Sequence, residues 1–259
     1  MEFNTALLHK NFSGDKASGS TMTPIYQVSA FSHSSAEQLE KVFNNKAPGY
    51  AYSRIGNPTV TSFEARIAAL ENGAGAVACS SGMAAVTMAL LNILESGDEI
   101  IVGAGLFGGT IDLLKDLEAF GITAHFADEV TPQNVEPLIN ERTRAVFAEL
   151  IGNPKLDIVD IESVSNLAHR YNIPLIIDSS ILSPNVSRPT EFKNALNGAR
   201  QQPKFRHIPF RSFARYESLP YFLYSFIPLN FSVSHSNLPL SIIIPLIAFP
   251  PPLIYFEVE

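Results

Sequence analysis

A Ser-Ser-Gly-Met run at residues 80–83 has the composition of an anion-binding turn. The run leads from an apolar segment into a helical pattern, so its backbone N–H groups would be the first of a helix, where they have no partner within the helix. These groups carry the positive end of the helix dipole, and Gly82 allows a ligand to approach closely. The run therefore predicts a phosphate-binding turn, with an ordinary serine helix cap as the alternative.

Three further residues that could contact a ligand stand where short apolar runs end. Asp178 closes the run Pro-Leu-Ile-Ile-Asp, Phe107 lies in a glycine-rich loop, and Asn153 stands in Gly-Asn-Pro. A carboxylate at the end of a strand either caps a nearby loop or binds a cation. A protonated pyridine nitrogen is one cation that such a carboxylate suits, because the acid keeps the ring electron-poor.

The elements that must position these residues alternate regularly from residue 57 onward. Apolar strands that alternate with helices of about ten residues indicate an α/β fold around a buried, mainly parallel sheet. Ligands of such sheets bind beyond the carboxyl ends of the strands, which is where the candidate residues fall. We expect strands at 76–79, 99–102, 123–126, 145–150 and 175–177, and helices at 35–43, 58–71, 83–94, 110–120, 132–140 and 161–171.

With these motifs in order, the sequence resembles the pyridoxal-phosphate enzymes of cysteine and methionine metabolism. They are the cystathionine γ-synthase-like group of the fold-type I superfamily, and the O-acetylhomoserine sulfhydrylase branch is the most similar. The resemblance covers about residues 3–192. It is carried by the stretches TPIYQVSAF, YAYSRIGNPTV, SSGMAAV, GLFGGT, ELIGNPKLDIVDI and PLIIDSS.

The resemblance implies an incomplete fold-type I large domain, in which a mainly parallel sheet is flanked by helices. We expect an N-terminal arm at 1–56, a partial α/β domain that binds pyridoxal 5'-phosphate at 57–192, and an unrelated Pro- and Phe-rich tail at 193–259. The family also implies a homo-oligomer, a dimer or tetramer, and a small amino-acid substrate.

The resemblance assigns the cofactor phosphate to two parts of the chain. The turn Ser81, Gly82 and Met83 would hold the phosphate through its N–H groups. Tyr52 and Arg54, which match a Tyr-x-Arg pair, would reach the same phosphate from a neighbouring subunit. Arginine suits this role because its guanidinium group can bind two phosphate oxygens at once.

The resemblance assigns the cofactor ring to four further residues. Phe107 would stack on the ring, at a position where many members of the family have tyrosine, so the phenol is lost here. Asn153 would lie near the ring hydroxyl, Asp178 would pair with the pyridinium nitrogen, and Ser180 would be a small hydroxyl neighbour. For Ser180 an ordinary loop role is an equal alternative.

The family's Schiff-base lysine has no counterpart at its expected place. The match ends at Phe192, and the position where the family has its lysine holds Pro203, with Lys204 next to it. No other side chain makes an exchangeable imine with the cofactor aldehyde, so we assign no catalytic residue and expect this chain alone to be inactive.

The composition of the chain changes at the same place. Residues 1–192 hold 12 Lys and Arg against 22 Asp and Glu, whereas the last 67 residues hold 6 against 3 and carry 9 of the 18 prolines. A truncated or frameshifted gene product would produce this change, and so would a splice or a genuine regulatory extension. Residues 238–256 are uncharged but contain five prolines, which disfavours a membrane span.

Charge and cysteine content exclude several classes of function. The net charge of −7 argues against nucleic acid and anionic membranes as partners. A single cysteine, Cys79, excludes a disulfide framework, and the six histidines are scattered without ligand spacing, so we assign no metal site. No secretory signal is recognisable, which makes the expected location cytoplasmic.

Two classes of function stay open. One is an enzyme lineage that converts O-acetylhomoserine and sulfide to homocysteine and acetate, with cystathionine γ-synthase, cystathionine γ-lyase or methionine γ-lyase chemistry as alternatives. The other is a non-catalytic pseudo-subunit that binds the cofactor or interacts with intact relatives.

Overall fold

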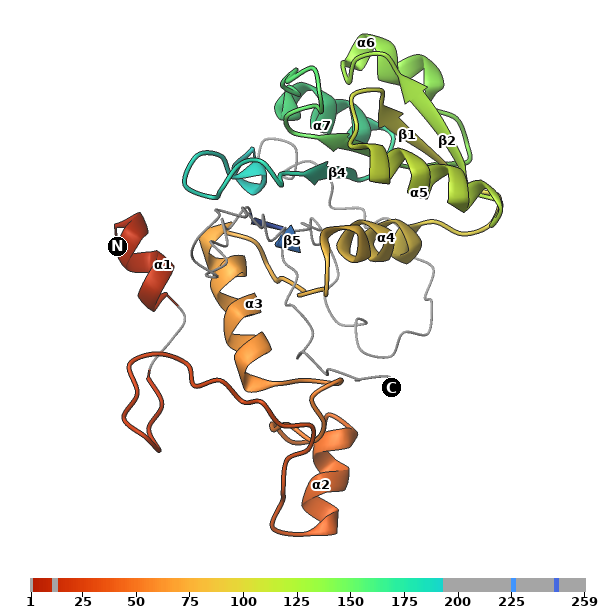
Figure 1. Ribbon diagram of the computed structural model, residues 1–259. Coiled ribbons are helices and arrows are strands. Elements are labelled where there is room, and N and C mark those ends of the chain that lie inside the picture. The colour runs from red at the N-terminus through yellow and green to blue at the C-terminus, as the bar shows by residue number, and fades with distance from the viewer. Residues whose placement is uncertain (1, 11–13, 193–224, 227–244, 247–259) are drawn as a thin grey trace, which may run out of the picture. The chain divides into compact units, whose positions relative to one another are not determined.

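The computed structural model describes residues 2–10, 14–192, 225–226 and 245–246 (Figure 1). These residues belong to two compact units, one that extends to Leu70 and one that begins at Glu71. Residues 225–226 and 245–246 form the two-residue strands β5 (Ser225–Phe226) and β6 (Pro245–Leu246), which pair antiparallel. The other residues of the predicted tail lie outside the described part of the chain.

The first unit contains three helices joined by extended chain. They are α1 (Phe3–His9), α2 (Ala36–Phe43) and α3 (Pro58–Leu70). Lys10 Nζ donates to the carbonyl of Ala69 at the end of α3, at 2.8 Å. Within the described residues of this unit, the buried apolar side chains are only Ala6, Val42 and Leu70, so the unit has little core of its own.

The second unit is built on a four-stranded parallel sheet. Its strands are β1 (Glu99–Gly103), β2 (Thr123–Ala127), β3 (Thr143–Glu149) and β4 (Leu175–Asp178). Their order across the sheet is β2-β1-β3-β4, and every pair is parallel. All five residues of β1 are buried, as expected for a central strand covered on both faces.

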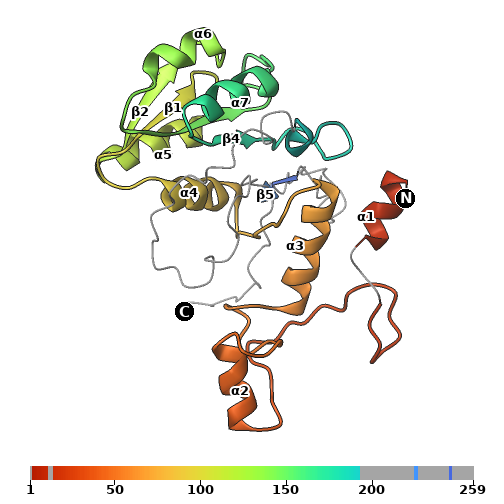
Figure 2. The ribbon, with the colours of Figure 1, turned by 180° about the vertical axis from the view of Figure 1, so that it is seen from behind.

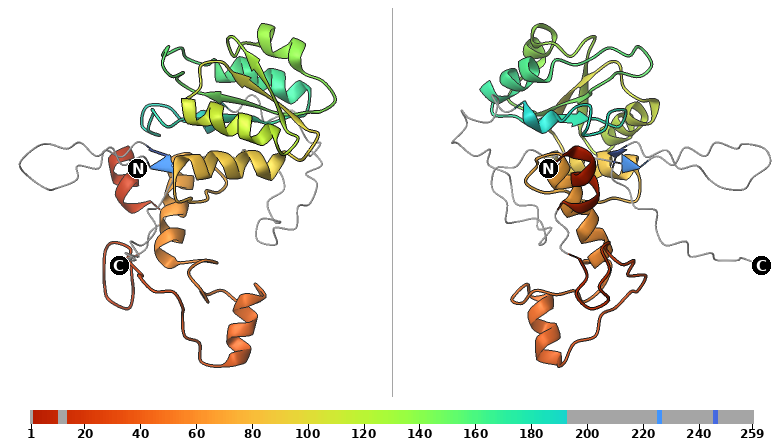
Figure 3. Two further views of the ribbon diagram at one scale, coloured as in Figure 1. Left: turned by 45° about the vertical axis from the view of Figure 1, so that its right-hand side comes forward. Right: turned by 90° about the vertical axis from the view of Figure 1, so that its left-hand side faces the viewer.

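Helices cover both faces of this sheet (Figures 2 and 3). One core cluster joins Leu90 of α4 (Gly82–Ile93) and Leu114 of α5 (Gly108–Glu118) to Phe147. A second cluster joins Leu167 of α7 (Ile161–Arg170) to Ile101 and Val146. Neighbouring residues of one strand point to opposite faces, so Phe147 and Val146 serve different clusters. The remaining elements are α6 (Pro132–Val135) and the 3-10 turns Glu136–Leu138 and Pro189–Glu191.

A buried carboxylate, Glu99, anchors the amino end of the sheet. His125 Nε2 lies 2.6 Å and Asn140 Nδ2 2.7 Å from its Oε2 atom, and Arg142 forms an ion pair with Oε1. The hydrogen bond from Asn140, followed by the contacts with His125 and Arg142, holds the pKa of Glu99 below its usual range. These contacts tie β1 to β2 and to the turn before β3.

The predicted fold class is confirmed, and two expected elements differ. The helix expected at 132–140 ends at Val135 and continues as a 3-10 turn, because Pro137 has no N–H group for a longer helix. Residues 76–79 form no strand in the described sheet, whose edge strands are β2 and β4. No helix within the described residues is long and apolar enough to cross a membrane.

Candidate functional site

The N-terminus of α4 has the properties of an anion site. Ser81 is its extended N-cap residue, and the Ser81 Oγ atom accepts from the N–H of Ala84 at 3.1 Å. Within the described residues, no acceptor takes the N–H groups of Gly82 and Met83. Two free donors at the positive end of a twelve-residue helix can bind a phosphate group.

Phe107 lies next to this turn. It is the N-cap residue of α5, and its side chain is 49% exposed. A Cβ atom on Gly109 would lie 2.7 Å from Phe107 Cε1 and 3.4 Å from Met83 Sδ, so the ring and the Met83 side chain meet over this glycine. The structure therefore brings the predicted stacking residue beside the predicted phosphate turn.

Glu149, which the sequence analysis did not single out, binds the main chain of Phe107. The Phe107 N–H donates to Glu149 Oε1 at 2.6 Å. Burial raises the pKa of Glu149 to about 7, the Phe107 N–H lowers it, and the charges of Asp178 and Asp157 raise it further. The signal in the sequence was available, because Glu149 is a carboxylate at the end of an apolar strand, as Asp178 is.

Asn153 lies in a loop that is fixed to the loop after β1. Its N–H donates to the carbonyl of Gly105 at 3.2 Å, and its side chain is exposed. The Asp157 carboxylate packs on both glycines of this junction, since a Cβ atom would come within 3.3 Å of it at Gly105 and 2.2 Å at Gly152. A side chain at Gly152 would displace the Asp157 carboxylate, and the hydrogen bond to Gly105 holds Asn153 at the carboxyl edge of the sheet.

Asp178 is a half-buried residue at the end of β4, opposite Glu149 in the sheet register. Its Oδ1 atom accepts from the N–H of Ser180 at 2.9 Å and from the Ser180 hydroxyl. Burial raises the pKa of Asp178 even though both hydrogen bonds from Ser180 lower it. Within the described residues no ion pair involves this carboxylate, so its surroundings fit a cation supplied by a ligand, such as a protonated ring nitrogen.

Tyr52 and Arg54 belong to the first unit and form a pair of their own. The guanidinium carbon of Arg54 lies 5.4 Å from the centroid of the Tyr52 ring, a distance typical of a cation–π contact. Both side chains are exposed, and the main chain of Tyr52 bridges to Ala30. The Arg54 guanidinium is therefore exposed, and no hydrogen bond or ion pair within the described residues involves it.

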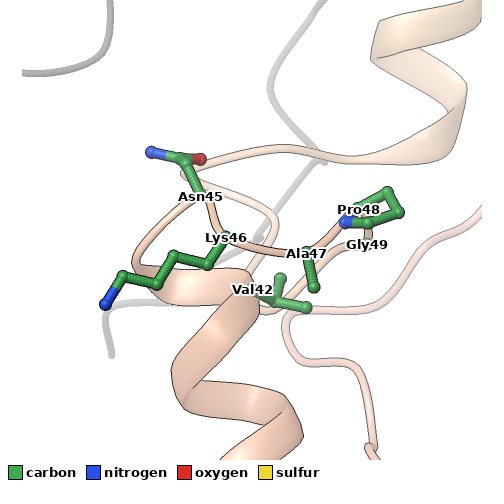
Figure 4. Close-up of a pocket in the computed structure, with 6 residues that line it drawn as sticks. All are labelled: Val42, Asn45, Lys46, Ala47, Pro48 and Gly49. Atoms are coloured by element: carbon green, nitrogen blue, oxygen red, sulfur yellow. The ribbon is translucent and has the colours of Figure 1, made fainter.

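A shallow hollow of about 360 Å³ lies at the end of α2 (Figure 4). Its lining consists of Val42, Asn45, Lys46, Ala47, Pro48 and Gly49. None of the predicted site residues lines it.

The structure thus gathers seven predicted residues of the second unit at the carboxyl edge of its sheet and at the start of α4. They are Ser81, Gly82, Met83, Phe107, Asn153, Asp178 and Ser180. Glu149 connects this set, because it bonds Phe107 and pairs with Asp178. Within the described residues no cluster of His, Cys, Asp and Glu side chains could hold a metal ion.

The chain is similar to known enzymes of sulfur amino-acid metabolism. It is 39% identical over 186 residues to the O-acetyl-L-homoserine sulfhydrylase of Leptospira meyeri, which covers 71% of this chain and 42% of that protein. The Corynebacterium glutamicum enzyme of the same name is 41% identical, with 73% of this chain and 44% of that protein covered. The L-methionine gamma-lyase of Treponema denticola is 39% identical, with 67% and 44% covered. The chain spans less than half the length of these curated relatives.

Two solved structures share the fold. One is assigned as an O-acetylhomoserine (thiol)-lyase from Campylobacter jejuni and contains N'-pyridoxyl-lysine-5'-monophosphate. It has a TM-score of 0.70 and 32% identity, and the match covers 74% of this chain and 48% of that one. The other is cystathionine gamma-lyase from Lactobacillus plantarum with L-serine, at a TM-score of 0.68, 37% identity and the same coverage. These neighbours confirm the predicted fold-type I architecture, of which this chain has a part.

A comparison with a family sequence profile agrees with these similarities to single proteins. Residues 4–195 fit the sequence profile described as "Cys/Met metabolism PLP-dependent enzyme". This range contains the parallel sheet, the turn at the start of α4 and both strand-end carboxylates. The resemblance stated from the motifs is therefore confirmed: the chain belongs to the pyridoxal-phosphate-dependent family of cysteine and methionine metabolism.

Proposed function

We propose that this chain binds pyridoxal 5'-phosphate at the carboxyl edge of its sheet and descends from the O-acetylhomoserine sulfhydrylase lineage. The observation that carries the proposal is the pairing of two complementary features in one unit. The N–H groups of Gly82 and Met83, which have no acceptor in the described part of the chain, suit a phosphate, and the half-buried carboxylate of Asp178 suits a ring cation.

Each residue has a defined task in this proposal. Ser81, Gly82 and Met83 bind the phosphate, and Phe107 covers the ring and excludes water from it. Asp178 holds a proton at the ring nitrogen, and Ser180 orients the Asp178 carboxylate by its two hydrogen bonds.

Asn153 would complete the ring site by donating its side-chain amide to the ring hydroxyl. When bound, the cofactor supplies an electron-poor ring that stabilises negative charge on the carbon atoms of an amino-acid substrate. The chain's own contribution is to bind, orient and desolvate that ring.

The substrate of the lineage is proposed to be O-acetylhomoserine with sulfide, because sulfhydrylases are among the relatives. Methionine gamma-lyases are similar to the same extent, so elimination chemistry is the alternative. We assign no catalytic residue to this chain, since Pro203 stands where the family has its lysine. This substitution also supports the second candidate function, a non-catalytic pseudo-subunit that retains the cofactor site.

The proposal is tested by titrating the full purified chain with pyridoxal phosphate. We expect saturable binding, seen by visible absorbance, and no covalent adduct in mass spectra after borohydride treatment. We also expect no homocysteine from O-acetylhomoserine and sulfide. An adduct or a turnover that disappears in Lys204→Ala would contradict the assignment of inactivity, and absence of binding would contradict the cofactor site.

A further inference from the structure

We propose that Glu149 is a positioning residue that fixes the main chain at Phe107 and thereby sets the aromatic ring against which the cofactor stacks. The part of this inference that concerns stacking of the cofactor on the Phe107 ring rests on the proposed function. The hold of Glu149 on Phe107 is a property of the chain itself and can be measured without a cofactor.

Glu149 has the geometry of a fixed acceptor. It is the last residue of β3, where its main chain is held in register opposite Asp178 of β4. Its side chain is buried, with 8% of the residue exposed. The distance of 2.6 Å from the Phe107 nitrogen to Glu149 Oε1 is shorter than the usual 2.9–3.0 Å of an N–H···O bond, as expected where an acceptor carries charge.

Glu149 satisfies a group that α5 cannot satisfy by itself. The N–H of an N-cap residue is commonly bonded by a Glu or Gln side chain three positions later in the helix. In α5 that position is Thr110, so the Phe107 N–H depends on a strand 42 residues away. The Phe107 carbonyl already accepts from Thr110 and Ile111, at 2.9 and 3.1 Å. With Glu149 in place, both polar groups of the Phe107 main chain are bonded.

Fixing this main chain fixes the ring. The Phe107 ring lies over Gly109, close to the Met83 side chain. Because Phe107 is half exposed, surrounding side chains do not hold the ring in place. A rotation of the backbone at Phe107 would carry the ring away from the start of α4. Glu149 therefore acts on the cofactor site through Phe107.

The charged groups that act on Glu149 make its hold on Phe107 dependent on pH. They are Asp178, on the neighbouring strand β4, and Asp157, in the loop after β3. Burial, with smaller contributions from these two carboxylates, brings the pKa of Glu149 to about 7. An ionised carboxylate accepts a stronger hydrogen bond than the neutral acid, so the bond to Phe107 strengthens as pH rises from 6 to 8.

The test compares three variants of the full chain. Glu149→Leu removes the acceptor, and Glu149→Gln keeps an acceptor oxygen without the charge. Glu99→Leu is the matched control, because Glu99 is also a buried carboxylate of this sheet but lies at its amino end. Amide hydrogen exchange at Phe107 is measured without cofactor, and visible circular dichroism is measured during titration with pyridoxal phosphate.

We expect Glu149→Leu to lower the exchange protection of the Phe107 amide at least tenfold and to reduce the dichroism of the bound cofactor. Glu149→Gln should keep the protection and lose its dependence on pH between 6 and 8. Glu99→Leu should lower the melting temperature and leave both readouts at their wild-type values.

The inference is overturned if Phe107 stays protected in Glu149→Leu, if the dichroism of that variant is unchanged, or if Glu99→Leu has the same effects. A wild-type chain that binds no pyridoxal phosphate would overturn the proposed function and the role of the ring. The exchange measurement would still decide whether Glu149 holds Phe107.

Discussion

At the scale of single residues, the three glutamates that are buried in the described part of the chain differ in what compensates their charge. Glu99 is surrounded by hydrogen-bond donors, and Glu149 has the Phe107 N–H. Neither carboxylate oxygen of Glu71 has a hydrogen-bond partner within the described residues, although only 2% of this residue is exposed. Burial raises the pKa of Glu71 to about 8, with Arg188 lowering it and Glu191 raising it.

The uncompensated Glu71 predicts a loss of stability as pH rises. Between its ordinary pKa of 4.5 and the folded value of about 8, the folded state binds more protons than the unfolded state. The free energy of unfolding therefore falls in this window, by up to about 1.4 kcal/mol per pH unit. Between pH 7 and 8 Glu149 and Asp178 also have raised pKa values and add the same slope to both proteins, so the difference between the wild type and Glu71→Gln reports the effect of Glu71. Urea unfolding of Glu71→Gln should show a flatter pH profile there, and curves parallel to those of the wild type would contradict this account.

The Asp178 carboxylate predicts opposite effects of one substitution on folding and on binding. Asp178→Asn keeps the size of the side chain and an acceptor for Ser180 but removes a poorly solvated charge. The melting temperature without cofactor should rise. The affinity for pyridoxal phosphate should fall by about 1.5–3 kcal/mol, or about tenfold to a hundredfold. Equal affinity in a titration of both proteins would show that Asp178 does not meet the ring cation.

At the scale of elements, the sequence predicted the strands whose positions are determined by residues close together in the chain. The strands at 99–102, 123–126 and 175–177 are found within two residues of their expected bounds, because continuous apolar runs mark buried strands. Among the described residues, 76–79 form no strand and only Cys79 makes a β-bridge, because strand pairing depends on a partner elsewhere in the chain. Glu149 was not predicted as a site residue for a similar reason, because its hydrogen bond joins it to Phe107, 42 residues earlier in the chain.

The start of α5 offers a test with an internal control. A side chain on Gly109 would collide with the Phe107 ring, whereas a Cβ atom on Gly108 would meet nothing within 4 Å. Gly109→Ala should therefore displace the ring and weaken binding of pyridoxal phosphate several-fold. Gly108→Ala should leave binding unchanged and stabilise the helix by up to about 1 kcal/mol. Equal affinities of the two variants would show that the ring position is irrelevant to the cofactor.

At the scale of the whole molecule, the first unit has little core, and it carries the exposed Tyr52–Arg54 pair. The sequence motif identified this pair, but the geometry of one chain does not test its proposed role toward a neighbouring subunit. That role depends on assembly, which a motif within one sequence does not encode.

The proposed exchange of this pair between subunits predicts that binding depends on assembly. Arg54→Ala should weaken binding of pyridoxal phosphate about tenfold or more in the oligomer, because a guanidinium that binds two phosphate oxygens is removed. Lys46→Ala, which removes another exposed cation of the same unit, should have no effect. Sedimentation analysis alongside the titration checks this. A monomer that binds as tightly as the oligomer, with Arg54→Ala unchanged, would contradict the proposal.

The Glu99 cluster has a consequence for how the sheet moves. Its contacts with His125, Asn140 and Arg142 join β1 to β2 and to the turn before β3 at the amino ends of the strands. The opposite ends of β3 and β4 carry Glu149 and Asp178, with Asp157 in the loop after β3, and the charges of both aspartates disfavour ionisation of Glu149. Thermal fluctuations of the strands should therefore increase from the amino edge of the sheet to its carboxyl edge. Such a gradient gives the loops that face a ligand freedom to adjust while the base of the sheet keeps the strand register.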